Sequence, residues 1–182
     1  MEVAEISKRL RNQIGDNDLE NPNITLDELD NIINNAAMEY SRIKGYLAFA
    51  EIPYNKNENV YIVPNDSYKV KSAILKNTNY KLKFIDNLNQ IIIEDEPYVE
   101  SDTIKLTYIK YFKPEEIDER EIDIYLILCE SLCYKLMASK TAEYIKFSTG
   151  EKMMDESLIS EKYLNLYKST FKIFKNKVIK AY

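Results

Sequence analysis

The side chains best suited to chemistry in this chain are acids gathered between residues 94 and 102. Carboxylates clustered in this way can hold a divalent cation, which prefers oxygen ligands. The members of the cluster are Glu94, Asp95, Glu96, Glu100 and Asp102. Cation-binding loops usually contain a glycine that sets the turn, and the chain has none between Gly45 and Gly150. We therefore interpret the cluster as a solvated, charged turn and expect no metal site.

The two cysteines, Cys129 and Cys133, lie four residues apart within a helical pattern that covers Ile122–Met137. One helical turn holds two thiols too rigidly for a good disulfide. A metal site would need further cysteine or histidine ligands, and the sequence contains neither. We expect both thiols to be small core side chains in a reducing compartment.

Nucleophilic and phosphate-binding chemistry find little support in the sequence. The chain has no histidine, so a serine at Ser148-Thr149-Gly150 would lack the commonest base, although a lysine-based dyad stays open. Its three glycines, Gly15, Gly45 and Gly150, are too far apart for a phosphate loop. We interpret residues 148–150 as a turn, and we expect neither enzymatic activity nor a cofactor.

Charge is distributed very unevenly along the chain. The last 21 residues, Lys162–Tyr182, contain six lysines and no acid. The other 19 bases face 30 acids, so residues 1–161 carry a net charge of −11, against −5 for the whole chain. The C-terminal segment is therefore suited to meet a negatively charged surface. A membrane, a nucleic acid or a protein partner would fit, and an ordinary amphipathic helix packed on its own core is the alternative.

Composition predicts an ordinary globular protein of 182 residues, with 45% apolar and 30% charged residues. Its 15 tyrosines against six phenylalanines fit half-buried subunit boundaries, or else coding bias. The first ten residues lack an apolar segment, so we expect no secretory signal. No apolar run approaches the roughly 20 residues of a membrane span, so we expect no membrane partner.

Hydrophobic periodicity divides the chain into three zones and predicts an α+β fold. Residues 1–45 are expected to form helices, one ending at Gly15 and one that starts with a capping box at Thr25 and Glu28 and stops at Gly45. Residues 46–114 alternate with period two and predict an inserted antiparallel β-sheet or meander. The expected strands are Val60–Val63, Tyr68–Ile74, Tyr80–Ile85, Ile91–Ile93 and Ile104–Tyr111.

Residues 115–182 return to helical period and are expected to complete a helical bundle with the N-terminal helices. Acids from Glu115 to Asp123 are expected in the first turns of a helix, where they complement its dipole. After a break at residues 146–150, a final basic helix is expected to start near Asp155. Its apolar face is Tyr163, Leu166, Tyr167, Thr170, Phe171, Phe174 and Val178.

The order of these parts resembles bacteriophage head–tail connector (adaptor) proteins. The first likeness is in Leu10–Asp16, Ile24–Leu29 and Ala36–Ser41, where the family has a short helix, an acidic loop and a capped helix. The second is Tyr144–Glu151 followed by Asp155–Ser157, which resembles the family's helix, loop and helix ending. Val60–Asp66, with the later Val70, also looks like the start of the β insertion of some adaptors.

The resemblance implies a structural virion protein in the neck of a tailed phage, made in the host cytoplasm. It implies a ring of about twelve copies beneath the portal protein, with head-to-tail contacts between subunits. Such a ring extends the channel for double-stranded DNA and offers its lower face to a stopper or tail protein. An acidic wall lets DNA slide, because cationic walls would hold the phosphates.

Under this hypothesis the final helix docks on an acidic rim of the portal. The residues expected to do so are Lys168, Phe171, Lys172, Phe174, Lys175, Lys180 and Tyr182. Deletion of residues 170–182 is then expected to abolish docking and to leave the remainder folded. The alternatives are another neck component, such as a tail-completion or stopper protein, a non-viral cytosolic helical module that binds a protein, and a small enzyme based on carboxylates and lysines.

Overall fold

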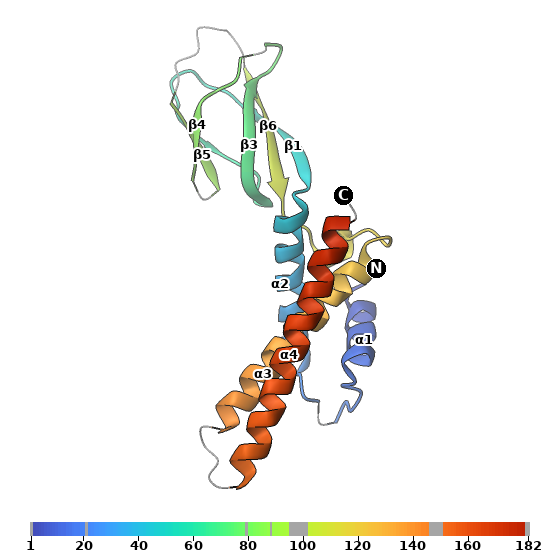
Figure 1. Ribbon diagram of the computed structural model, residues 1–182. Helices are drawn as coiled ribbons and strands as arrows, with labels where there is room; N and C mark the ends of the chain where they lie inside the picture. Colours follow the sequence, from blue (N-terminus) through green and yellow to red (C-terminus); the bar gives the residue numbers. More distant parts are fainter. Residues whose placement is uncertain are drawn as a thin grey trace. The chain divides into compact units, whose positions relative to one another are not determined.

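The computed structural model describes residues 2–20, 22–78, 80–87, 89–94, 102–145 and 151–180, without the side chains of 144–145, 151–156 and 180. The chain forms two compact units (Figure 1). The helical unit contains Met1–Tyr40 and Lys113–Tyr182, and the β unit contains Ser41–Phe112. The predicted α+β class, with helices at both ends of the chain and an antiparallel insertion between them, is confirmed.

The N-terminal helices begin and end where the sequence predicts. Helix α1 covers Val3–Ile14, and Gly15 ends it with a φ of 73°, a left-handed conformation that glycine adopts without steric cost. Helix α2 covers Leu26–Lys44 and starts with the predicted capping box. The backbone N–H of Thr25 donates to Glu28 Oε2 at 2.9 Å, and the N–H of Glu28 donates to Thr25 Oγ1 at 3.3 Å.

Helices α3 (Ile122–Ile145) and α4 (Glu151–Lys180) form an antiparallel pair (Figure 1). Ser160 Oγ donates to the carbonyl of Ala138, and the rings of Tyr134 and Tyr163 stack at 6.4 Å. Helix α3 is buried on more than one side, because Leu128, Ser131 and Ala138 are buried in addition to Tyr125, Leu126 and Cys129. It is therefore the central helix of the helical unit.

Both cysteines are free thiols buried on α3, as the sequence predicts. Burial raises the pKa of both, that of Cys133 to about 12, because the charged thiolate is disfavoured away from water.

The acids expected in the first turns of α3 mostly precede it. Pro114–Glu116 form a short 3₁₀ helix, η1, and a turn leads to Ile122. Only Asp123 lies in the first turn of α3. The dipole argument for α3 therefore applies to a single residue, and the earlier acids lie in η1 and in the turn that follows it.

The β unit consists of two three-stranded antiparallel sheets. One has the order β1-β6-β3 (sheet A) and the other β2-β5-β4 (sheet B). The two sheets share one core of side chains such as Tyr61, Leu75 and Leu106. The bounds are β1 Leu47–Pro53, β2 Val60–Ile62, β3 Ser67–Leu75, β4 Phe84–Asn87, β5 Gln90–Ile93 and β6 Thr103–Lys110. Only β4 and β5 pair as sequential neighbours, so most of the pairing is long-range.

Two details of this unit differ from the sequence prediction. The alternating segment Tyr80–Ile85 is not one strand: Lys81 makes an isolated bridge to Ile74, and β4 starts at Phe84. The N–H of Leu82 donates to the carbonyl of Ala73, so this segment lies along β3. Strand β1 forms at Leu47–Pro53, where no strand was predicted. Its alanines, Ala48 and Ala50, weakened the apolar alternation.

Several predictions fall outside the described residues. They concern Asp95, Glu96 and Glu100 of the acidic cluster and the turn at residues 148–150. The last helix starts at Glu151, one turn earlier than expected.

Candidate docking surface

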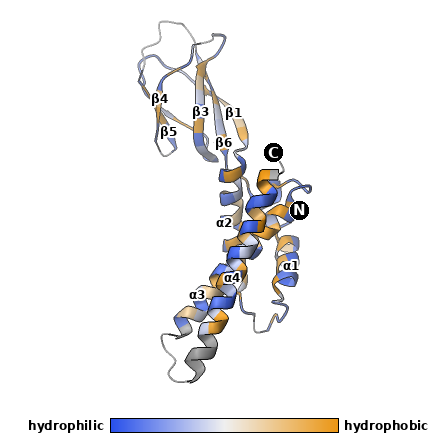
Figure 2. Ribbon diagram, viewed as in Figure 1, coloured by the Kyte–Doolittle hydropathy of each residue, from blue (hydrophilic) through white to orange (hydrophobic). Residues whose placement is uncertain are grey.

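Helix α4 carries the predicted basic surface, and its apolar face holds it in the helical unit. Thr170, Phe174 and Val178 are buried, at spacings of four residues that place them on one side of the helix. The ring of Phe174 lies 6.3 Å from that of Tyr40 on α2, and Tyr40 contacts Tyr125 on α3 at 6.1 Å. These contacts fix the rotation of α4 about its axis, and Figure 2 shows polar and apolar residues distributed along it.

Because that rotation is fixed, three lysines point to solvent as a row. Lys168, Lys172 and Lys175 follow one another at four and three residues and are all exposed. None of the three makes an ion pair with another residue that the structure describes. The Lys175 ammonium lies 4.6 Å from the centre of the Phe171 ring, a cation–π contact. We call these three residues the lysine row.

The structure separates the predicted docking residues into three groups. The lysine row is exposed, and Phe171 is half-buried between Tyr167 and Phe174, with ring distances of 5.7 and 5.9 Å. Phe174 is fully buried, so its prediction as a surface anchor is wrong. The Lys180 side chain and Tyr182 lie outside the described residues.

The burial of Phe174 also overturns the expected effect of the C-terminal deletion. Removal of residues 170–182 would remove three buried side chains, Thr170, Phe174 and Val178, from the helical unit. Large losses from a core cost several kcal/mol, so the truncated chain is not expected to stay folded.

Two exposed apolar side chains of α4 were not predicted from the sequence, and one of them, Ile179, follows Lys175 by four residues on the side of the lysine row. Ile173 is 50% exposed and Ile179 is 75% exposed. Both residues lie off the predicted apolar face, so their positions on the helix could have indicated that they are exposed. Apolar side chains among lysines provide contact area in addition to charge, which is the usual composition of a protein interface.

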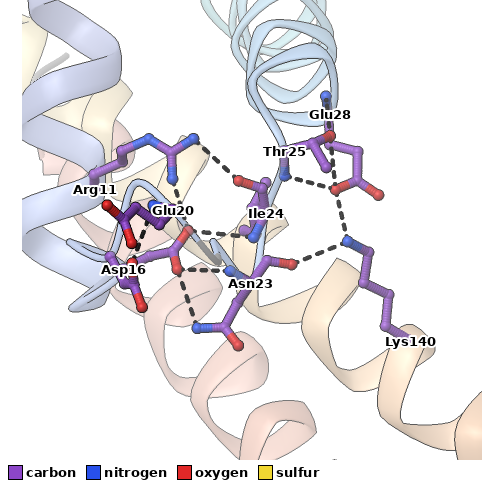
Figure 3. Close-up of polar contacts among 9 residues, drawn as sticks. Arg11, Asp16, Glu20, Asn23, Ile24, Thr25, Glu28 and Lys140 are labelled. Carbon is purple, nitrogen blue, oxygen red and sulfur yellow. Dashed lines mark hydrogen bonds and ion pairs between the residues drawn. The ribbon is translucent and has the colours of Figure 1, made fainter.

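A polar network, buried at Arg11 and Asp16 and partly exposed at Glu28 and Lys140, holds the segment between α1 and α2 (Figure 3). Arg11 donates to Asp16 at 2.8 Å and to the carbonyl of Ile24 at 3.0 Å. Asp16 also accepts the backbone N–H groups of Asn23 and Ile24. Lys140 of α3 donates to the carbonyl of Asn23 and to Glu28 Oε2. The network satisfies every one of these polar groups within the helical unit, so we assign it a structural role.

Tyrosine and carboxylate groups between α3 and α4 form a similar internal contact. The Tyr134 hydroxyl donates to the Glu130 carboxylate at 3.1 Å. Burial, and to a smaller extent the nearby Glu130 carboxylate, raise the pKa of Tyr134 to about 12. Burial also raises the pKa of Glu130, while the Tyr134 hydroxyl opposes that shift. This pair lies on the packed side of α3 rather than on an open site.

The residues that the structure describes contain neither a metal centre nor a membrane span. Within them, no three cysteine or acidic side chains come together as a metal site. No helix in the same ranges combines the length and apolarity needed to cross a membrane. In comparisons with known proteins, no family model matches the chain, and no curated protein matches it either.

Proposed function

We propose that the protein is a structural head–tail connector of a tailed phage virion. In this role it forms a ring beneath the portal protein, extends the DNA channel and offers a docking face to a stopper or tail protein. It acts through shape and surface charge rather than through catalysis.

The single observation that carries the proposal is the exposed lysine row on a helix whose opposite face is anchored in the core. A row on a packed helix presents its charges in a fixed arrangement, so little conformational entropy of the backbone is lost when a partner binds. An acidic rim on the portal would complement Lys168, Lys172 and Lys175, and Ile179 on the same side of the helix would add apolar contact.

The charge of the rest of the chain supports the same role. Residues 1–161 have a net charge of −11, which disfavours retention of DNA phosphates. A ring of identical subunits would bring these acids together around the channel. The ring requires a head-to-tail interface between different surfaces of neighbouring copies.

The test is charge reversal of the lysine row in the full chain. The triple variant K168E/K172E/K175E should lose binding to portal rings of the phage that encodes the chain, because all three side chains are exposed and dispensable for the core. A matched control, K8E/K56E/K113E, changes the net charge equally at exposed lysines elsewhere and should bind normally. Sedimentation of each variant with portal rings measures the effect.

Two results would reject the proposal. One is equal binding by the triple variant and the control. The other is absence of the protein from purified particles of that phage, measured by mass spectrometry. A tail-completion or stopper protein would instead bind the connector ring and leave the portal unoccupied, which the same sedimentation assay distinguishes.

A further inference from the structure

Strand β1 forms an open edge of sheet A in the β unit (Figure 1). Among the strands that the structure describes, its only partner is β6. Two hydrogen bonds show which residues of β1 face β6: the N–H of Lys110 donates to the Tyr46 carbonyl, and the N–H of Tyr54 donates to the Asp102 carbonyl. In an antiparallel pair the bonded positions alternate, so Ala48, Ala50 and Ile52 bond to β6. The N–H and C=O groups of Leu47, Phe49 and Glu51 therefore point away from the sheet.

These outward backbone groups have no partner among the described residues. The opposite edge of the same sheet is different. On β3, the N–H of Val70 donates to the Asp86 carboxylate at 2.9 Å, and the N–H of Leu75 donates to the carbonyl of Tyr80 at 3.1 Å. One edge of sheet A is thus bonded within the chain, and the edge formed by β1 is available for another strand.

The side chains beside this edge are apolar and exposed. Leu47 is 59% exposed and Phe49 is 77% exposed, the latter the most exposed large apolar side chain among the residues described. A groove on the same face is lined by Phe49, Glu51, Ile74, Lys105 and Thr107, among others. Exposed apolar groups at alternate positions of an open edge are a hazard for aggregation unless a partner covers them.

The outer face of sheet A is basic. Cross-strand partners share a face, so the register places Lys69, Lys76 and Lys105 on the face of Leu47 and Phe49, together with one acid, Glu51. Glu51 is already paired with Lys76 at 2.6 Å. Lys69 and Lys105 are exposed and form no ion pair with described residues. Charge complementarity therefore favours an acidic occupant.

From these observations we infer that the β1 edge binds an extended, acidic segment of a partner protein, which adds to sheet A as a fourth strand. Its backbone would bond to Leu47, Phe49 and Glu51, its apolar side chains would cover Phe49, and its acids would meet Lys105 on β6, the nearer of the two exposed lysines in the order β1-β6-β3. Pro53 at the end of β1 has no N–H, which limits the added strand to the first part of the edge. This inference goes beyond the connector proposal and does not depend on it.

The probe for the test is a labelled nine-residue peptide, Val-Thr-Glu-Thr-Val-Thr-Glu-Thr-Val, in which valine and glutamate lie on the same face of an extended strand, titrated into the full chain by fluorescence polarisation. The control probe replaces each glutamate with lysine. We expect the acidic probe to bind at least about tenfold more tightly than the basic one. Equal affinity of the two probes would overturn the acidic specificity and with it the proposal.

Two variants at one position separate the backbone from the side chain. Phe49→Thr keeps the outward N–H and loses the ring, whereas Phe49→Pro also removes the N–H without removing a bond to β6. Binding should fall several-fold in the first and a further fivefold or so in the second, as expected for one lost hydrogen bond. Equal binding by the two variants would contradict strand addition.

Hydrogen exchange of the wild-type protein provides a test that does not depend on how the variants fold. With the acidic probe bound, the amides of Leu47 and Phe49 should exchange at least about tenfold more slowly. Those of Ala48 and Ala50, which already bond to β6, should change little. Unchanged exchange at Leu47 and Phe49 under saturating probe would reject the site.

Discussion

The guanidinium of Arg11 donates a 2.8 Å hydrogen bond to the carboxylate of Asp16, and both side chains are almost fully buried. Two residues before Arg11, Arg9 forms a pair of nearly equal length, 2.7 Å, with Glu5 on the exposed side of the same helix. The two pairs share their chemistry and differ in burial. Burial decides how much each pair contributes to the free energy of unfolding, because a buried ion that loses its partner is left unsolvated.

Asp16→Ala is expected to destabilise the helical unit by about 3–5 kcal/mol, since it leaves the Arg11 guanidinium buried without its counter-ion. The loss of the bonds from Asn23 and Ile24 to Asp16 adds to this effect. Glu5→Ala, the matched control, should cost less than about 1 kcal/mol. Urea unfolding of both variants measures the difference, and similar values would show that the buried network contributes no special stability.

The capping box of α2 predicts a second, smaller effect. Thr25→Ala removes the acceptor for the Glu28 N–H and should destabilise the protein by about 1 kcal/mol. Thr25→Ser keeps the hydroxyl and serves as the control. Thermal unfolding followed by circular dichroism should place the serine variant near wild type and the alanine variant several degrees lower. No difference between the two would mean that the cap is dispensable.

The same glutamate predicts a dependence on pH. The hydrogen bond from Lys140 lowers the pKa of Glu28 below its ordinary value of 4.5, and burial only partly opposes this. A group with a lowered folded-state pKa stabilises fully above its unfolded pKa, and the contribution disappears as the pH falls through the folded value. Glu28→Gln should remove this part of the pH dependence below about pH 4.5. An unchanged slope of stability against pH in that variant would contradict the assignment.

Periodicity and end signals predicted most helix ends, although α4 starts at Glu151 rather than near Asp155. Gly15, Gly45 and the Thr25–Glu28 box mark ends that depend on local chemistry, and the structure places them there. The strand pairing could not be predicted in this way. Strand β6 pairs with β1 and β3, which lie far from it in sequence, and a local sequence pattern does not indicate such contacts. The interruption of the predicted strand Tyr80–Ile85, whose first part lies along β3, likewise depends on tertiary contacts.

The docking surface could be predicted only in part, because residue spacing shows which side chains share a face of a helix but not which face is buried. Lys168, Lys172 and Lys175 share a face by spacing alone, so their exposure follows from the helix. Phe171 and Phe174 are only three residues apart, and which of them is buried depends on where Tyr40 and Tyr125 lie. The open edge formed by β1 could be identified only from the order of the strands in sheet A, which the sequence pattern does not reveal.

Buried thiols predict slow chemical modification. Burial raises the pKa of Cys133 to about 12, and Cys129 is fully buried, so neither thiol is ionised or accessible in the folded protein. A thiol reagent such as 5,5′-dithiobis(2-nitrobenzoate) should react with neither cysteine at pH 8, and with both after unfolding in guanidinium chloride. Rapid reaction of one thiol in the native protein would show that α3 opens locally.

The two phenylalanines of α4 predict different consequences for folding and docking. Phe174→Ala should destabilise the helical unit by about 3–5 kcal/mol, because the side chain is fully buried against Tyr40 and Phe171. Phe171→Ala removes a half-buried ring and the cation–π partner of Lys175, so its cost in stability should be clearly smaller. Denaturant unfolding gives the two free energies, and portal binding is compared only for variants that remain folded.

If Phe171→Ala weakens portal binding while its unfolding free energy stays close to wild type, the half-buried ring contributes to the docking surface. If both variants lose stability equally, Phe171 belongs to the core and the lysine row acts without an aromatic anchor.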